Sequence, residues 1–179
     1  MKTAILQMPI QLGDFRANLD TLQHMLASAM EQRPDVVLLP ELWDVGYYPH
    51  PISEHADPNG ERICKVLAEL AAKYQVNIVG GSAAIRINDN VFNTCYVFNR
   101  SGQLAASYDK THLFAPGGEK FDFTPGDRLV TYTLDGIKCA TLICYDIRFP
   151  EAARSLALQD IAVLFVPAAW PASRIMHWN

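Results

Sequence analysis

The stretch TLICYDIRFPE, residues 141–151, changes character at Cys144. The apolar residues before this cysteine are typical of the end of a β-strand, and the segment after it is charged and contains Pro150. Proline suits the first turn of a helix, because a backbone N–H at that position has no partner within the helix. We therefore predict a strand that delivers Cys144 to its end, and a helix that starts near Pro150 and continues through EAARSLALQ.

Apolar runs rich in β-branched residues recur along the chain, and several are apolar on both faces, which is typical of central strands in a covered sheet. These runs are TAILQM (3–8), VVLLP (36–40), VNIVGGSAAI (76–85), KCATLI (138–143) and IAVLFVPAA (161–169). The segment VFNTCYVFNRSGQLAASYDK (91–110) predicts a β-hairpin with its turn at 99–102.

Two segments between these runs carry apolar residues at helical spacing. Residues 14–32 place three leucines and one methionine on one stripe, and residues 60–75 form a similar stripe. Strands that alternate with helices, together with one hairpin, indicate an α/β layered fold. The chain shows no internal repeat and no linker, so residues 1–179 are expected to form one domain.

Composition excludes several classes of partner. The chain has 179 residues, a net charge of −4 and no run of lysine or arginine, so nucleic acid is not an expected partner. No apolar run approaches the roughly 20 residues that span a bilayer. The four cysteines form no CxxC pair, and the five histidines show no metal-ligand spacing. We therefore expect a reduced, cytoplasmic protein without a metal site.

Chemically active side chains follow several of the apolar runs. Glu41 comes directly after VVLLP, Lys110 after the second hairpin strand, and Cys144 after KCATLI; Trp170 follows the last run. Sites in open α/β sheets form beyond the carboxyl ends of the strands. We therefore expect a carboxylate, an ammonium and a thiol to meet in one site.

These three groups suit nucleophilic attack on a carbonyl carbon. A thiol is mostly protonated at neutral pH, because its ordinary pKa is about 8.5, and a neighbouring carboxylate can accept its proton. The ammonium of Lys110 and the backbone N–H of Tyr145 can stabilise the oxyanion that forms. A second acid, Glu119 in the segment APGGEKFDF, can position the lysine or the attacking water.

Three segments resemble motifs of the nitrilase superfamily, the carbon–nitrogen hydrolases: LLPELWDVGYYP with Glu41, YDKTHLF with Lys110, and LICYDIRFPE with Cys144. They occur in the family's order, and the resemblance extends over the whole chain. It implies a four-layer αββα sandwich and hydrolysis of a non-peptide C–N bond through a thioester, with no metal and no organic cofactor. The second and third segments resemble the amidase branch that includes the omega-amidases, so the implied substrate is a small carboxamide.

Family members continue beyond the point that the end of this chain matches. The resemblance therefore implies that residues 1–179 are a carbon–nitrogen hydrolase domain that is incomplete at its C-terminus. The family's C-terminal part closes the sandwich and contributes to a dimer interface. A homodimer or a higher homo-oligomer is accordingly expected if the full domain is present.

Two alternatives stay open. The same site could hydrolyse N-carbamoyl compounds, or the chain could be a truncated, catalytically silent member of the family. A papain-like protease would pair Cys144 with His177, but the presence of Glu41 and Lys110 argues against it.

Aromatic and cysteine residues outside the three motifs allow two interpretations. Four aromatic side chains are candidates for lining a substrate pocket, although aromatic side chains also serve as ordinary core. These candidates are Tyr47, Phe114, Tyr145 and Trp170. Cys64, Cys95 and Cys139 are expected to be structural, because free cysteine behaves as a small hydrophobic residue.

Overall fold

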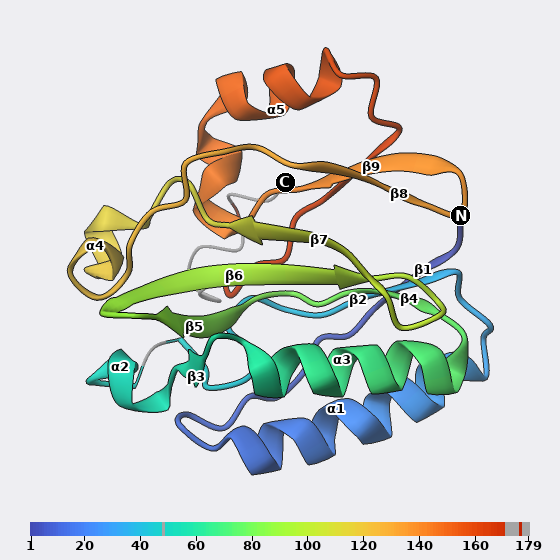
Figure 1. The fold of residues 1–179 in the computed structure, drawn as a ribbon, viewed down its shortest axis with the longest axis horizontal. Coiled ribbons are helices and arrows are strands. Elements are labelled where there is room, and N and C mark those ends of the chain that lie inside the picture. The colour runs from blue at the N-terminus through green and yellow to red at the C-terminus, as the bar shows by residue number, and fades with distance from the viewer. Residues whose placement is uncertain (48, 171–175, 177–179) are drawn as a thin grey trace.

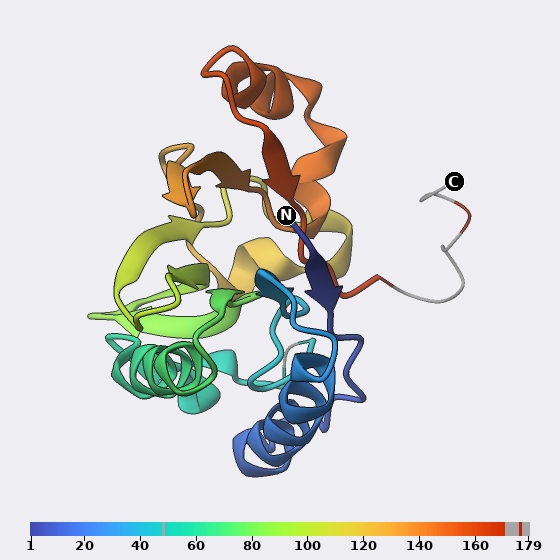
Figure 2. The same cartoon turned by 90° about the vertical axis from the view of Figure 1, so that its right-hand side faces the viewer.

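Two β-sheets lie face to face in the middle of the molecule, and helices cover the outer face of each (Figure 1). The computed structural model describes residues 1–47, 49–170 and 176. A view turned by 90° shows the same four layers in the order helix, sheet, sheet and helix (Figure 2). The predicted αββα sandwich is therefore confirmed.

The first sheet combines parallel strands with antiparallel hairpins. Its strands run in the order β1 (Thr3–Ile5), β2 (Val36–Leu38), β4 (Asn77–Val79), β6 (Asn90–Phe98), β5 (Ala83–Ile87) and β3 (Asp57–Pro58), and β7 (Leu104–Asp109) also pairs with β6. Strands β1, β2 and β4 are parallel, whereas β6 is antiparallel to β4, β5 and β7. Strand β7 therefore runs in the same direction as β2, and the carboxyl ends of both reach the same edge of the sheet.

The second sheet is smaller, with the strand order β10 (Val163–Phe165), β9 (Ile137–Thr141) and β8 (Thr131–Leu134). Strand β10 is parallel to β9, and β8 is antiparallel to it. Helices α1 (Phe15–Met30) and α3 (Glu61–Tyr74) cover the first sheet, and α5 (Pro150–Ala157) covers the second. The shorter helical elements are α2 (Ile52–His55), α4 (Glu119–Asp122), and the 3-10 helices η1 (Ala115–Gly117) and η2 (Cys144–Arg148).

Strand β2 shows why the central runs are apolar on both faces. Val37 packs in the cluster that includes Leu26 of α1, between the helices and the first sheet. Val36 and Leu38 pack in the other cluster, between the two sheets, which includes Leu142. A strand covered on both sides needs a continuous apolar sequence rather than an alternating one.

The main helices lie close to where the sequence predicts them. Helices α1 and α3 begin and end within two residues of the predicted segments 14–32 and 60–75, and α5 begins at Pro150. Asp14 caps α1, because its side chain accepts the backbone N–H of Ala17 at 3.0 Å. Among the described residues, no helix has the length and apolar character that a bilayer crossing requires.

The predicted strand 76–85 is wrong as a single element. It forms two strands, β4 and β5, separated by a break at 80–82. Gly81 has a φ of +62°, and a Cβ atom built on it would lie 2.0 Å from the carbonyl oxygen of Pro40. The N–H of Ser82 donates to the same carbonyl at 3.1 Å, so the break is tied to the loop that follows β2.

The hairpin of β8 and β9 is a feature that the apolar runs do not predict. Its turn consists of Asp135 and Gly136, with positive φ values of 49° and 79°. This is the geometry of a type I′ turn, for which an Asp–Gly pair is a strong sequence signal.

We expect Gly81→Ala to destabilise the protein more than Gly136→Ala. Both glycines have positive φ, which costs a residue with a side chain about 1 kcal/mol or slightly more. Only Gly81 also brings its new Cβ against backbone, so its total cost should reach about 3 kcal/mol, whereas nothing lies within 4 Å of a Cβ at Gly136. Urea unfolding of both variants measures the difference, and equal losses would contradict the close packing of Gly81 on Pro40.

Candidate active site

The loops after β2 and β7 bring Glu41 and Lys110 into direct contact. Both strands end at the same edge of the first sheet, as their shared direction requires. The Nζ of Lys110 donates to Oε1 of Glu41 at 2.8 Å, and neither side chain has exposed surface. A buried ammonium needs such a partner, because an unpaired charge in a protein interior is very unfavourable.

The backbone around Glu41 is held by the break between β4 and β5. Leu42 has a left-handed φ of 48°, and its N–H donates to Oγ of Ser82 at 3.0 Å. The backbone N–H of Trp43 donates to the carbonyl of Ser82 at 3.1 Å, and its indole N–H donates to the carbonyl of Gly80 at 3.0 Å. These bonds set the direction in which the loop presents Glu41.

Glu119 makes the second contact with Lys110. It is the first residue of α4, and its side chain is fully buried. Its carboxylate accepts hydrogen bonds from Nζ of Lys110 at 2.8 and 3.0 Å, and another from the N–H of Phe114. With the bond to Glu41, the ammonium of Lys110 is held between two carboxylates.

The charge of Lys110 is stabilised by these carboxylates. Burial disfavours the charged form, but the negative charges of Glu41 and Glu119 outweigh this effect and raise the pKa of Lys110 above its ordinary value. Lys110 therefore remains an ammonium at any physiological pH. It can act as a fixed positive charge, and it is poorly suited to donate a proton.

Asn93 belongs to this cluster, and the motifs do not predict it. Its buried Nδ2 donates to Oε1 of Glu41 at 3.1 Å and to Oε1 of Glu119 at 3.0 Å. Its backbone carbonyl accepts the N–H of Lys110 at 2.9 Å across the hairpin. The available signal was a lone amide side chain in the otherwise apolar start of the hairpin. The register that places it opposite the lysine depends on an irregularity in the β6–β7 pairing.

Cys144 reaches the cluster from the second sheet. It opens η2 directly beyond β9, has a left-handed φ of 45°, and is 6% exposed. Its backbone N–H donates to the carbonyl of Pro167 at 2.9 Å, and the N–H of Ala169 donates to Oε2 of Glu41 at 2.9 Å. The segment after β10 therefore contacts both Cys144 and Glu41.

The surroundings of Cys144 keep its sulfur protonated. Burial raises the pKa of this thiol above its ordinary value, and the charge of Glu41 and a hydrogen bond to Glu41 raise it further. The charge of Lys110 and the N–H of Ala169 act in the opposite direction but are outweighed. Helix α5 begins at Pro150, as predicted, and the backbone at the sulfur forms the short 3-10 helix η2. The resting site holds a neutral thiol beside a proton acceptor.

Asp146 ties the turn at Cys144 to the loop after β7. Its fully buried carboxylate accepts the backbone N–H of Ile143 at 2.9 Å and the hydroxyl of Tyr108 at 2.7 Å. It also accepts the backbone N–H of His112 at 2.8 Å. Since the two loops come from different sheets, this carboxylate fixes their relative position.

Two aromatic candidates lie together between these loops. The rings of Phe114 and Tyr145 meet edge to face, with centroids 5.0 Å apart. The ring of Trp170 lies under the guanidinium of Arg148, which is 5.4 Å from the ring centroid. A role of these rings in lining a substrate pocket stays a prediction.

Tyr47 lies on the loop after β2 and is 38% exposed. A Cβ atom built on Gly117 would lie 3.2 Å from its hydroxyl oxygen, so this ring lies against η1. Its role in substrate binding also stays a prediction. His177, which the protease alternative requires, lies outside the described residues.

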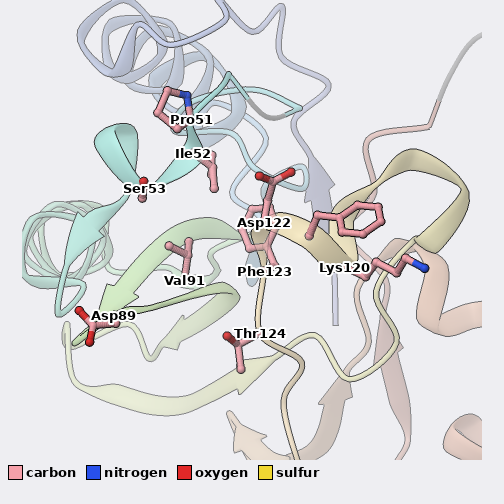
Figure 3. A pocket seen from close by; sticks show the side chains of 10 residues that line it. Pro51, Ile52, Ser53, Asp89, Val91, Lys120, Asp122, Phe123 and Thr124 are labelled. Carbon is pink, nitrogen blue, oxygen red and sulfur yellow. The ribbon is translucent and has the colours of Figure 1, made fainter.

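A surface pocket of about 400 Å³ is lined by residues that do not belong to the buried cluster (Figure 3). Its lining comes from residues 51–53 at the start of α2, from Asp89 in the β5–β6 turn, from Val91 in β6, and from residues 120–124. Residues 120–122 belong to α4. Glu119, the first residue of α4, contacts Lys110 and is not part of the pocket lining. Within the described ranges, no group of three or more His, Cys, Asp or Glu side chains is arranged to hold a metal ion.

Comparisons with known proteins match the whole chain. A family model for carbon–nitrogen hydrolases matches residues 2–179. The protein named "Hydrolase in agr operon" of Staphylococcus aureus is 39% identical over 181 residues, which cover 100% of this chain and 69% of that relative. The 2-oxoglutaramate amidase of Bacillus subtilis is 38% identical over 174 residues, covering 97% of this chain and 67% of that enzyme. The chain thus spans about two thirds of the length of these relatives.

Solved structures match the fold. The crystal structure of Nit3 from Saccharomyces cerevisiae, a member of branch 10 of the nitrilase superfamily, has a TM-score of 0.91 and 28% identity over 99% of this chain and 68% of that chain. A variant of the amidase from Nesterenkonia sp. AN1 has a TM-score of 0.85 and 27% identity over 98% of this chain and 70% of that chain. That structure shows the result of Michael addition of acrylamide at the active-site cysteine.

Asp44, in the loop that carries Glu41, links stability to pH. It is fully buried; Oδ2 accepts the N–H of Ala84 at 3.3 Å, and Oδ1 has no hydrogen-bond partner among the described residues. Burial raises its pKa from 3.8 to about 7, although the N–H of Ala84 and the charge of Arg62 oppose this shift. Between these two pH values the folded protein holds a proton that the unfolded chain has released.

The contribution of Asp44 to the free energy of unfolding should therefore be most favourable at low pH. It should become less favourable as the pH rises from about 4 to about 7. Asp44→Asn resembles the protonated form, so it should match wild type near pH 4 and exceed it near pH 8 by up to about 4 kcal/mol. Asp135→Asn is a control whose effect on stability should have the opposite sign. The hydrogen bond from Arg100 lowers the pKa of Asp135, so its charged form stabilises the folded protein and the substitution should reduce stability near pH 8. Urea unfolding at both pH values would contradict this reading if Asp44→Asn kept the wild-type pH dependence.

Proposed function

Since the chain belongs to the carbon–nitrogen hydrolase family, we propose that it is an amidase that cleaves a small carboxamide through a thioester on Cys144. The family and its amidase relatives support a hydrolase that acts on C–N bonds. The observation that carries the proposal is the buried contact of Lys110 with Glu41 and Glu119, beside a protonated thiol. Nucleophile, proton acceptor and fixed positive charge are the parts that acyl transfer requires.

Acylation begins when Sγ of Cys144 attacks the carbonyl carbon of the amide and the thiol proton passes to Glu41. A carboxylate oxygen has two lone pairs. Oε1 of Glu41 already accepts from Lys110 and Asn93, whereas Oε2 accepts from the N–H of Ala169. Oε2 is therefore the oxygen with room for the thiol proton.

The tetrahedral intermediate places a negative charge on the former carbonyl oxygen. The ammonium of Lys110 is held beside Glu41 and Glu119, and its positive charge stabilises this oxyanion. The backbone N–H of Tyr145, the residue after the nucleophile, supplies a direct hydrogen bond. The intermediate then collapses, the C–N bond breaks, and Glu41 gives its proton to the leaving nitrogen, which departs as ammonia from a primary amide.

Deacylation repeats the same chemistry with water. Glu41 accepts a proton from the water that attacks the thioester carbon, and the C–S bond breaks as the second intermediate collapses. The thiolate then takes the proton from Glu41, so that the site returns to its starting state. The sum is amide plus water to carboxylic acid plus ammonia, with no redox step.

Two relatives support the substrate class. The Bacillus subtilis enzyme is named for 2-oxoglutaramate, and a double mutant of the Nesterenkonia amidase has been solved in complex with acrylamide. Both compounds are small primary amides. A small substrate also fits a nucleophile that is only 6% exposed. We therefore place short primary amides, including the omega-amides of dicarboxylic acids, first among the candidate substrates.

Ammonia release from a panel of short primary amides, omega-amides and N-carbamoyl amino acids tests the proposal. We expect turnover with one or more amides, and a loss of at least about 1,000-fold in Cys144→Ser and in Lys110→Met, because each change removes a part of one catalytic unit. Cys139→Ser is the matched control, since Cys139 is also buried but lies five residues earlier within β9. It should retain wild-type activity per folded molecule.

Three results would change the conclusion. Turnover that survives in Cys144→Ser would place the nucleophile elsewhere. Activity on N-carbamoyl compounds alone would replace the amidase with a carbamoyl hydrolase in the same site. No turnover by the folded wild-type chain would favour a catalytically silent member of the family.

A further inference from the structure

Buried asparagines differ in how completely their amide groups are satisfied. Asn77 on β4 donates to the carbonyl of Asp35 and to Asp135, and its Oδ1 accepts the N–H of Arg100. Asn93 on β6 is equally buried, but only its nitrogen is bonded, and its Oδ1 has no partner among the described residues. Buried amides normally satisfy both ends, so this exception requires an explanation.

The two carboxylates explain the orientation of Asn93. If its oxygen and nitrogen exchanged places, the carbonyl oxygen would face Oε1 of Glu41 and Oε1 of Glu119 at about 3 Å, where both partners carry only lone pairs. The amide therefore keeps its N–H groups on the carboxylates and leaves its own oxygen unsatisfied. A residue with a purely structural role, such as Asn77, shows no such compromise.

The amide completes a set of donors that Lys110 cannot supply alone. Nζ of Lys110 donates to Oε1 of Glu41 and to both carboxylate oxygens of Glu119. Asn93 donates one more hydrogen bond to each carboxylate, in both cases to Oε1. Two negative charges that share one ammonium repel each other, and hydrogen bonds from added N–H donors to charged oxygens are strong enough to hold both carboxylates in place.

We propose that Asn93 is a positioning residue that holds Oε1 of Glu41 and Oε1 of Glu119 beside Lys110 and leaves Oε2 of Glu41 as the oxygen that receives the proton of Cys144. The inference rests on the proposed function for its catalytic meaning. Charged and titratable groups face the amide cluster from four elements: Glu41 from the loop after β2, Lys110 from the end of β7, Glu119 from α4 and Cys144 from η2. Asn93 on β6 is the uncharged member that joins both acids.

Asn93→Asp is the most direct test, because it keeps the size of the side chain and replaces the N–H donor with a third carboxyl group. Three carboxylates around one ammonium hold an extra proton, so the acid side of the pH–rate profile should move up by about one pH unit or more. At neutral pH, kcat should fall by about 100-fold or more, while KM should change by less than about threefold. The pH profile for alkylation of Cys144 by iodoacetamide should move in the same direction.

Two further variants keep this test informative. Asn93→Ala removes both N–H donors without adding a charge, so we expect the same direction of change with a smaller loss of kcat, about tenfold. Asn77→Asp is the matched control, because it makes the same substitution at an equally buried amide that also binds a carboxylate, remote from Cys144. It should lower the melting temperature and leave both pH profiles unchanged.

Two results would overturn the inference: pH profiles of folded Asn93→Asp and Asn93→Ala that superimpose on wild type, or an equal shift in Asn77→Asp. Alkylation needs no substrate, so it separates this inference from the proposed activity. A shifted alkylation profile in a chain that hydrolyses no amide would support the role of Asn93 and contradict the amidase. Amide turnover, together with alkylation profiles that do not shift in the Asn93 variants, would support the amidase and contradict the role of Asn93.

Discussion

A buried ammonium between two buried carboxylates is the constraint on which the site depends. Lys110, Glu41 and Glu119 have no exposed surface, so each charge has lost its hydration and must be compensated by neighbours. Breaking such a group by removing one partner is strongly destabilising, because it leaves an uncompensated buried charge. The donors from Asn93 and Ala169 complete the compensation around Glu41. The same arrangement that makes the charges tolerable also presents a carboxylate to the thiol.

The fold supplies this cluster by ending strands from both sheets in one place. Strands β2 and β7 run in the same direction in the first sheet, which brings the loops of Glu41 and Lys110 together. The second sheet contributes Cys144 after β9 and the N–H of Ala169 after β10. Asp146 joins the loops of the two sheets through buried hydrogen bonds. The sandwich therefore brings the thiol of Cys144 from one sheet to the carboxylate of Glu41 on the other.

Sequence patterns predict much of this, and the omissions have physical causes. Apolar runs predict the strands, and the residues that follow them include Glu41, Lys110 and Cys144, because strand ends are where such sites form. Hydropathy carries no information on backbone dihedral angles, so it does not predict the left-handed φ at Leu42 or at Cys144. Asn93 escapes prediction because its position opposite the lysine depends on an irregular hairpin register.

Some expectations from the sequence remain predictions. The homodimer and the pocket-lining roles of Tyr47 and Trp170 concern contacts beyond those described for this chain. The break at Gly81, by contrast, was readable in principle, because two adjacent glycines in a strand pattern signal a close approach of backbone. The contact of Gly81 with the carbonyl of Pro40, directly before Glu41, is a long-range contact that hydropathy does not specify.

The most direct measurement is the mass of the protein during the first turnovers of an amide, by rapid acid quench, intact-mass analysis and peptide mapping. Covalent catalysis by this cluster predicts an increase equal to the acyl group, located on Cys144 and absent from Cys64, Cys95 and Cys139, which lie on α3, β6 and β9. The adduct should appear before ammonia release reaches its steady rate and should disappear as substrate is exhausted. Ammonia release without any acylated protein at the earliest times, or an acyl group on another residue, would contradict a thioester mechanism at Cys144.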